Sequence, residues 1–307
     1  MKSASTLLIL TLISSLSAFA QQRVCSQGQG SDRLELPGGY VAQVAPAGDD
    51  AHAGECHASI TTDTAKTVFE LFEREIAINP ISGKDVNADG VPDAVIETHP
   101  AAGKCCWNYY VFSLGQSPGL LRQFSTSVAL NFEDKLGDGK VEIWTRDFAF
   151  DGVDNFPHAE SPAPLIFFRM HGTTVNNVSQ LFWQDYEREI NETRSYISRD
   201  DIDTLTKVEG DNPKPPEEGD PKEAHLRSVR AQILALVLDY IYADHTPDAF
   251  KTISDMWPVL DRQRLRQLIL QRRGRGILSE INRIPKTSAA VTVGAAPPAT
   301  TPANANQ

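Results

Sequence analysis

The sequence predicts an α+β protein, with an N-terminal antiparallel β meander domain and a small C-terminal α-helical module. Two observations set the order of these regions. From about residue 34 to residue 182, short segments rich in Val, Ile, Phe, Tyr, Trp and Thr alternate with turn residues, as in a series of antiparallel strands. From residue 222 to residue 244, the apolar side chains instead recur with the period of an α-helix.

The β region divides into strands at its turn residues. LPGGYVAQV has a Gly-Gly turn before an alternating run, and HASITTDTAKTVFELFE reads as a hairpin around Thr62–Thr64. Its second half also fits a helical stripe, but its flanks are strands and Asn79-Pro80 follows without a stop glycine, so we expect a strand. The strands expected next are PDAVIETH, WNYYVFSLG, LLRQFST, SVALNFED, KVEIWTRD, LIFFRMHG and TVNNVSQLF.

The helical module is expected between a linker and a low-complexity tail. Residues 184–221 predict a charged helix followed by the acidic, proline-rich linker EGDNPKPPEEGDP. Residues 222–284 predict three helices that pack as the module. The Ala-, Thr- and Pro-rich residues 285–307 are expected to be disordered. With these boundaries, the β domain spans residues 21–183.

The first twenty residues have the features of an export signal peptide. Lys2 precedes an apolar run from Leu7 to Ile13, and small residues occupy positions 18 and 20. We therefore expect cleavage near Ala20 and a periplasmic or extracellular mature chain. No later segment approaches the roughly 20 apolar residues of a transmembrane helix.

The mature chain is acidic. Removal of the leader takes away Lys2 and leaves 28 basic against 40 acidic residues, a net charge of −12. Such a chain repels nucleic acid and suits hard cations. We expect an unidentified protein or glycan partner and no nucleic-acid partner, and the sequence leaves the oligomeric state open.

Four cysteines allow three pairings in an oxidising compartment: Cys25, Cys56, Cys105 and Cys106. Neighbouring residues of a strand point to opposite faces, so we favour a bond from each of Cys105 and Cys106 to one of Cys25 and Cys56. The alternative is a Cys25–Cys56 bond with a vicinal or free pair.

The segment DVNADGVPD predicts a calcium loop. Oxygen-bearing groups fall at loop positions one, three, five, seven and nine, namely Asp85, Asn87, Asp89, the Val91 carbonyl and Asp93. Gly90 at position six permits the sharp turn, and calcium takes six to eight oxygen ligands. Position twelve is Ile96 rather than Glu, which excludes an EF-hand. The alternative is a polar turn that binds no metal.

A second segment, DKLGDGKVE, repeats this pattern about fifty residues later. Asp134, Asp138 and Glu142 align with positions one, five and nine of the first loop, and Gly139 with position six. Leu136 replaces the ligand at position three, so this loop is the weaker candidate and could be a turn that retains the fold of a site without its ion. Both loops precede a β segment, which indicates repeated, propeller-blade-like units with calcium loops.

These loops resemble the FG-GAP/VCBS repeats of integrin-like β-propellers. More narrowly, DVNADGVPDAVIE, CCWNYYVFSLG, LGDGKVEIWTRDFAF and SPAPLIFFRMHG resemble a group of exported bacterial proteins of unassigned function. The resemblance covers about residues 80–182 and implies calcium at the first loop and no enzymatic activity. Because two loops cannot supply the four to eight blades of a closed propeller, we expect a smaller β domain.

The sequence therefore favours an exported, calcium-binding protein that acts by binding rather than by catalysis, with calcium in a structural role. One alternative is a secreted glycoside or ester hydrolase with a site in the proline-rich 148–164 loop, where the candidate side chains are Asp151, Asp154, His158 and Glu160. Another is a helical adaptor that uses residues 222–284.

Three smaller features have a functional and a structural interpretation. His52, Cys56 and His57 could bind a transition metal, but a disulfide at Cys56 is the stronger interpretation. Trp107, Tyr109 and Tyr110 could stack on a sugar, but alternation along a strand places at least one of their faces in the core. The arginines between residues 262 and 275 fit a solvated helix face or a docking surface.

Overall fold

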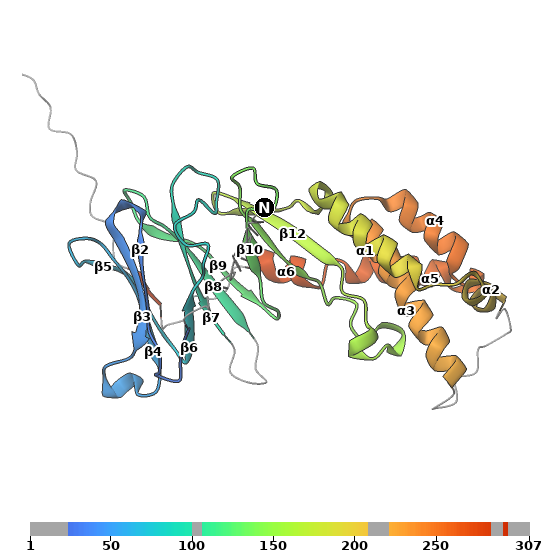
Figure 1. Cartoon of the computed structure of the whole chain (residues 1–307), viewed down its shortest axis with the longest axis horizontal. Helices are drawn as coiled ribbons and strands as arrows, with labels where there is room; N and C mark the ends of the chain where they lie inside the picture. The colour runs from blue at the N-terminus through green and yellow to red at the C-terminus, as the bar shows by residue number, and fades with distance from the viewer. Residues whose placement is uncertain (1–23, 100–105, 208–220, 284–290, 294–307) are drawn as a thin grey trace, which may run out of the picture.

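A computed structural model describes residues 24–99, 106–207, 221–283 and 291–293. It shows antiparallel sheets in the N-terminal part and helices in the C-terminal part, which confirms the predicted α+β class (Figure 1). The predicted signal peptide, most of the proline-rich linker and most of the predicted tail lie outside these residues. No helix in this part of the chain has the length and apolar character needed to cross a membrane.

Three sheets make up the β region, and we name them by position. The outer sheet has the order β14-β5-β4-β3-β2, the middle sheet β1-β6-β7-β8-β9, and the helix-side sheet β10-β11-β12-β13. The outer strands are β2 (Asp32–Leu36), β3 (Tyr40–Pro46), β4 (Cys56–Thr61), β5 (Thr67–Glu73) and β14 (Val291–Val293). The middle strands are β1 (Val24–Ser26), β6 (Glu75–Ile78), β7 (Asp93–Thr98), β8 (Trp107–Ser113) and β9 (Gly119–Thr126). The helix-side strands are β10 (Asn131–Glu133), β11 (Glu142–Arg146), β12 (Leu165–His171) and β13 (Thr174–Asn177).

The ambiguous segment after Thr64 forms strands, as predicted. β4 and β5 pair antiparallel across the expected turn. Only Arg74 separates β5 from β6, and the chain changes from the outer to the middle sheet there. This bend between two short strands explains why the apolar residues of the segment also fit a helical stripe.

The middle sheet separates two hydrophobic cores. On β8, Tyr110 and Phe112 face the core shared with the outer sheet, whereas Tyr109 and Val111 face the core shared with the helix-side sheet and the helices. Every residue of β7 is buried. Both faces of the β8 aromatic segment are therefore core, and among its aromatic residues Trp107 at its end is half-buried.

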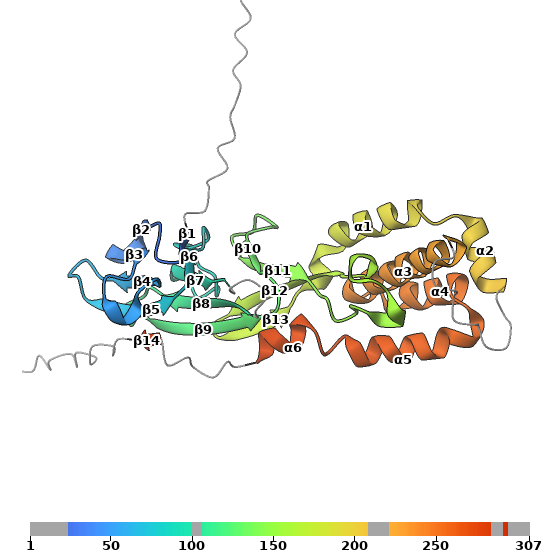
Figure 2. The same cartoon turned by 90° about the horizontal axis from the view of Figure 1, so that it is seen from below.

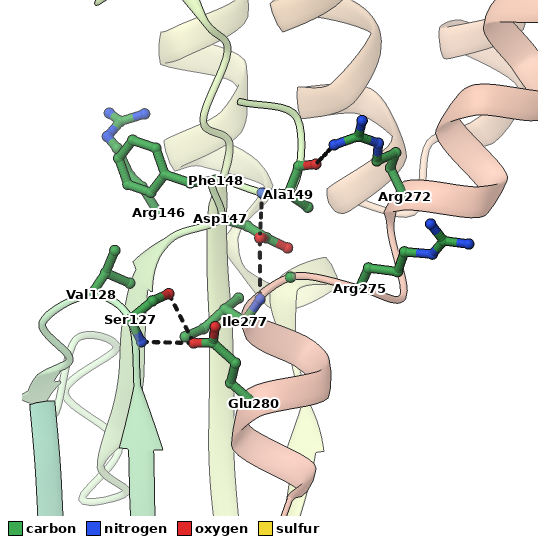
Figure 3. Close-up of a pocket in the computed structure, with 11 residues that line it drawn as sticks. Ser127, Val128, Arg146, Asp147, Phe148, Ala149, Arg272, Arg275, Ile277 and Glu280 are labelled. Atoms are coloured by element: carbon green, nitrogen blue, oxygen red, sulfur yellow. Dashed lines mark hydrogen bonds between the residues drawn. The ribbon is translucent and has the colours of Figure 1, made fainter. Parts of the chain in front are cut away.

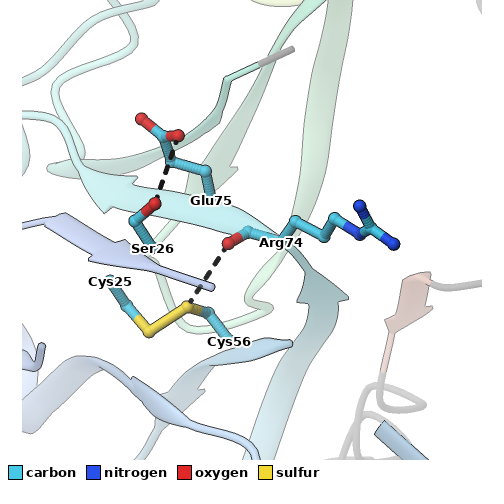
Figure 4. The surroundings of a disulfide bond; sticks show 5 residues. All are labelled: Cys25, Ser26, Cys56, Arg74 and Glu75. Carbon is cyan, nitrogen blue, oxygen red and sulfur yellow. Dashed lines mark hydrogen bonds between the residues drawn. A yellow bond between two sulfur atoms is a disulfide. The ribbon is translucent and has the colours of Figure 1, made fainter. Parts of the chain in front are cut away.

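A disulfide joins the outer and middle sheets. Cys25 is bonded to Cys56, with their Cα atoms 5.9 Å apart (Figure 4). The favoured pairing of each with Cys105 or Cys106 is therefore wrong, and the alternative Cys25–Cys56 bond is confirmed. The bend at Arg74 explains the outcome, because Cys25 pairs with Ile76 and Cys56 with Glu73 on either side of it. Cys106 is also disulfide-bonded, and Cys105 lies outside the described residues.

Six helices are described, and their bounds are α1 (Trp183–Ser195), α2 (Arg199–Lys207), α3 (Pro221–Tyr242), α4 (Thr246–Met256), α5 (Arg262–Arg272) and α6 (Ile277–Asn282). The expected helices of the C-terminal region are present, and the charged segment before the linker forms two helices. Buried side chains of α1, α3, α4 and α5 belong to the same core as the helix-side sheet. α6, which the sequence did not predict, lies against β9 (Figure 2).

The two acidic loops occupy equivalent places in consecutive sheets. The first loop joins β6 to β7, which continues through β8 to β9, and the second joins β10 to β11, which continues through β12 to β13. This succession matches the repeat seen in the sequence. The sheets follow one another along the long axis of the molecule and do not form a closed ring (Figure 1).

Candidate functional site

The first acidic loop is tightly curled by its own hydrogen bonds. Ala88 and Gly90 have positive φ angles of 57° and 85°, the left-handed conformation that a sharp turn needs. The carboxylate of Asp85 accepts hydrogen bonds from the backbone N–H groups of Asp89 (3.2 Å) and Gly90 (2.8 Å). Asp89 in turn accepts from the N–H of Val91 (2.8 Å). A carboxylate has about four lone-pair sites, so these bonds leave capacity for a cation.

Asn87 lies inside this loop. It is fully buried, its side-chain amide donates to Asp89 (2.9 Å), and its side-chain oxygen accepts from the Asp89 N–H (3.2 Å). Its backbone carbonyl accepts from the N–H of Gly172, at the β12–β13 turn, which ties the loop to the next sheet. Positions one, three and five of the loop are therefore in direct contact.

Asp93 has a buried oxygen without a partner. The side chain is fully buried, and its Oδ2 accepts from the N–H groups of Val86 (2.8 Å) and Asn87 (3.3 Å). Its Oδ1 is buried and has no hydrogen-bond partner among the described residues. Burial raises the pKa of Asp93 to about 7; the two N–H groups oppose this rise, and the charges of Asp89 and Asp85 add to it. A cation near Oδ1 would satisfy this carboxylate.

The chemistry of the first loop fits calcium, although its carboxylates do not form a ready-made cluster. Within the described ranges, no three His, Cys, Asp or Glu side chains are arranged to hold a metal. Calcium draws on amide and carbonyl oxygens as well, and those of Asn87 and Val91 are in this loop. Asp85 is half-buried and Asp89 exposed, so both side chains can turn towards an ion, whereas Asp93 is already held in place.

The second loop repeats three of these hydrogen bonds at equivalent positions. The N–H of Gly139 donates to Asp134 (3.0 Å), and that of Lys140 donates to Asp138 (3.1 Å). The N–H of Lys135 donates to Oε2 of Glu142 (2.8 Å), as that of Val86 does to Asp93. The two loops thus have the same local fold.

The second loop differs because a cation from the neighbouring strand β12, Arg169, reaches its carboxylates. Its guanidinium donates to Oε1 of the fully buried Glu142 and to both oxygens of Asp138 (3.0 and 3.1 Å). The carboxylates at positions five and nine therefore share one positive group. At position three, Leu136 is 46% exposed, whereas Asn87 in the first loop is fully buried.

Strand pairing explains why the first loop lacks such a cation. Arg169 on β12 lies directly across from Glu142 on β11. The corresponding residue across from Asp93 is Ser113 on β8. Serine cannot neutralise a carboxylate, so within the described part of the chain the charge of Asp93 has no cation, and a bound ion or a proton would compensate it.

The other metal site suggested by the sequence, at His52, Cys56 and His57, is not formed in the described structure. Cys56 is in the disulfide and is unavailable as a thiolate ligand. His52 and His57 both stack on Phe72, with ring centroids 4.0 and 4.5 Å away, and each lies 2.8 Å from a different glutamate. These histidines therefore have structural contacts.

The 148–164 segment packs against the core and the helices at several points. The sequence predicted a long surface loop, but Phe150, Val153 and Phe156 are buried in the core next to the helices. Of the four hydrolase candidates, only Asp151 and His158 meet, at 3.0 Å on the surface. The other two pair with arginines of the helices, Asp154 with Arg264 (2.7 Å) and Glu160 with Arg227 (3.4 Å).

A cavity of about 280 Å³ lies where the β9–β10 connection meets the segment after β11 and the α5–α6 connection (Figure 3). Asp147 beside it is fully buried and accepts from the Tyr242 hydroxyl (2.7 Å) and from the N–H groups of Ala149 (3.0 Å) and Ile277 (3.2 Å). A Cβ at Gly276 would lie 1.9 Å from the Asp147 carboxylate, so the approach of these segments requires glycine.

The arginines around this cavity do not form an anion site. Figure 3 shows the guanidinium groups of Arg146 and Arg275 pointing away from each other. Arg146 pairs with Glu189 (3.0 Å), and Arg272 donates to the carbonyl of Ala149 (3.3 Å). We therefore interpret the cavity as part of the joint between the helices and the sheets.

Comparisons of the chain with protein-family models, with curated proteins and with solved structures found no match. The FG-GAP/VCBS resemblance thus stays a prediction based on the loop motifs. The structure adds one feature that the sequence reasoning missed, the guanidinium of Arg169 in the second loop. Predicting it requires the β11–β12 register, which pairs residues 27 positions apart.

Proposed function

We propose that this protein is an exported, non-catalytic binding protein whose β region is stabilised by one calcium ion at the first acidic loop. The observation that carries the proposal is the fully buried Asp93, whose Oδ1 has no partner in the described structure. A buried carboxylate is costly without a compensating positive charge or hydrogen bond. Calcium would supply that charge.

The ligands proposed for this ion are the oxygens of Asp85, Asn87, Asp89 and Asp93 and the carbonyl of Val91. Bound calcium would connect the curled loop to the start of β7, a strand that contributes to both cores. The chain's own residues would hold the ion, and the ion would hold the loop against the middle sheet. Its role is structural.

In the second loop, we propose that Arg169 takes the place of the ion. Its single positive charge already pairs with the carboxylates at two of the three acidic positions. This interpretation favours a turn that keeps the fold of a calcium site without binding calcium. The protein then has one calcium site rather than two.

Thermal unfolding with calcium and with a chelator tests the proposal. A ligand present at one hundred times its dissociation constant stabilises the folded state by about 2.7 kcal/mol. For a chain of this size, that corresponds to a rise in Tm of about 5 to 10 °C. Asp89→Ala should abolish the rise, and the matched Asp138→Ala should retain it. Equal melting curves of the wild type with calcium and with chelator would contradict the proposal.

A further inference from the structure

A second cavity, of about 400 Å³, lies between the middle and helix-side sheets. Its walls come from the ends of β6, β7 and β8 on one side and from β10 and β11 on the other. Its volume falls in the range of about 300 to 1,000 Å³ that is usual for small-ligand pockets. It is separate from the first acidic loop, none of whose proposed ligands lines it.

Aromatic rings form one part of this cleft. Trp107, Phe132 and Trp144 line it and are each half-buried, so part of each ring is accessible. Trp107 is held by the ring of His99, at a centroid distance of 4.4 Å, and Phe132 by Tyr109, at 5.4 Å. Exposed faces of rings that are fixed in this way suit a ligand with an apolar face.

A buried polar network forms another part. Glu97 is 5% exposed and accepts a hydrogen bond from the side-chain amide of Asn79 (2.9 Å). His99 lies between two carboxylates, with Nε2 3.3 Å from Glu97 and Nδ1 2.8 Å from Glu75. Asn79, Glu97 and His99 all line the cavity, and their mutual contacts fix their orientation.

We infer that this cleft binds a neutral saccharide. A sugar ring has C–H groups that pack on aromatic faces and hydroxyls that both donate and accept hydrogen bonds. The carboxylate of Glu97 can accept further hydrogen bonds, and the amide of Asn79 has a donor and an acceptor group. His99, whose two ring nitrogens face Glu97 and Glu75, holds the Glu97 carboxylate in position. Because Glu97 and Glu133 both line the cleft, uronic, sialic and sulfated sugars would be repelled.

This inference gives a ligand class to the binding role proposed above, and it does not depend on calcium. The two ideas have separate tests, since calcium is measured by thermal unfolding and the saccharide at named tryptophans. A failure of one measurement would leave the other result standing.

The test uses the full chain with ¹⁵N-labelled tryptophan. Trp107 and Trp144 line the cleft, whereas Trp183 and Trp257 lie in the helical part and serve as internal controls. The indole N–H signals, assigned with single Trp→Phe variants, are followed during titration with chitotetraose, cellotetraose and maltotetraose. Tetragalacturonic acid is the anionic counter-probe, and an aromatic-rich tetrapeptide tests the competing ligand class.

We expect at least one neutral tetrasaccharide to shift the Trp107 and Trp144 signals saturably and to leave those of Trp183 and Trp257 unmoved. Trp107→Ala should weaken that binding about tenfold, as should Glu97→Gln, whereas Trp183→Ala should leave it unchanged. The inference is overturned if no neutral probe shifts the two cleft signals at a probe concentration of about 10 mM, where even weak binding would be detected. It is also overturned if the anionic probe or the peptide binds more tightly.

Discussion

Removing the charge at position nine, Asp93 in the first loop and Glu142 in the second, should have opposite effects on folding stability. Asp93→Asn removes a buried charge that has no counter-charge among the residues that the structure describes, whereas Glu142→Gln removes one half of an ion pair. Burial raises the pKa of Asp93 from 3.8 to about 7. The folded state is therefore destabilised as the pH rises through 7 and Asp93 becomes charged. The shift sets an upper limit of about 4 kcal/mol, and solvent near the exposed loop reduces it to about 1 to 3 kcal/mol at pH 8.

In the second loop, Glu142→Gln leaves the guanidinium of Arg169 with Asp138, at the surface, as its remaining acidic partner among the described residues. Removing one partner of a buried pair costs about 3 to 5 kcal/mol. In chelator at pH 8, Asp93→Asn should therefore keep or raise the Tm, and Glu142→Gln should lower it by about 6 to 20 °C. The assay is thermal unfolding followed by circular dichroism, with and without calcium. The reasoning is refuted if Asp93→Asn lowers the Tm in chelator as far as Glu142→Gln, or if calcium still raises the Tm of Asp93→Asn.

Three further predictions concern other parts of the chain. Arg169→Ser should lower the Tm in chelator, because it leaves the buried carboxylate of Glu142 without a cation. Calcium should restore part of this loss. Equal melting curves of the variant with and without calcium would argue against the equivalence of the two loops. The double variant Cys25→Ser/Cys56→Ser should lose about 3 to 4 kcal/mol in denaturant unfolding, since the bond closes a loop with a sequence separation of 31, and an unchanged midpoint would contradict this. Burial, together with the charge of Glu189, raises the pKa of Asp239 on α3 to about 8, so the wild type loses folding stability as the pH rises through 8. The free energy of unfolding of Asp239→Asn should exceed that of the wild type by on the order of 3 kcal/mol at pH 9 and by less at pH 4. A difference that does not change with pH would count against this prediction.

The sequence predicted the order of strands and helices well because the hydrophobic period changes visibly between the two regions. It also placed the two acidic loops before equivalent strands, since loop motifs are local in sequence. The favoured cysteine pairing was wrong because it was argued from the alternation of side chains near β8, which is local in sequence. The actual pairing depends on the bend at Arg74, which brings β1 and β4 together.

The difference between the two loops was also beyond sequence reasoning. Arg169 and Ser113 lie far from the loops in the chain, and only the strand registers place them opposite Glu142 and Asp93. The cleft between the sheets is a similar case, because Trp107 and Trp144 come from different sheets. Features that depend on pairing between distant segments required the structure.

The most direct measurement of the central claim is the number of calcium ions bound per chain, determined by equilibrium dialysis at pH 8. We predict one ion for the wild type, none for Asp93→Asn and one for Glu142→Gln, with folding of each variant checked by circular dichroism. No ion bound to the wild type, or an ion retained by Asp93→Asn, would contradict the account.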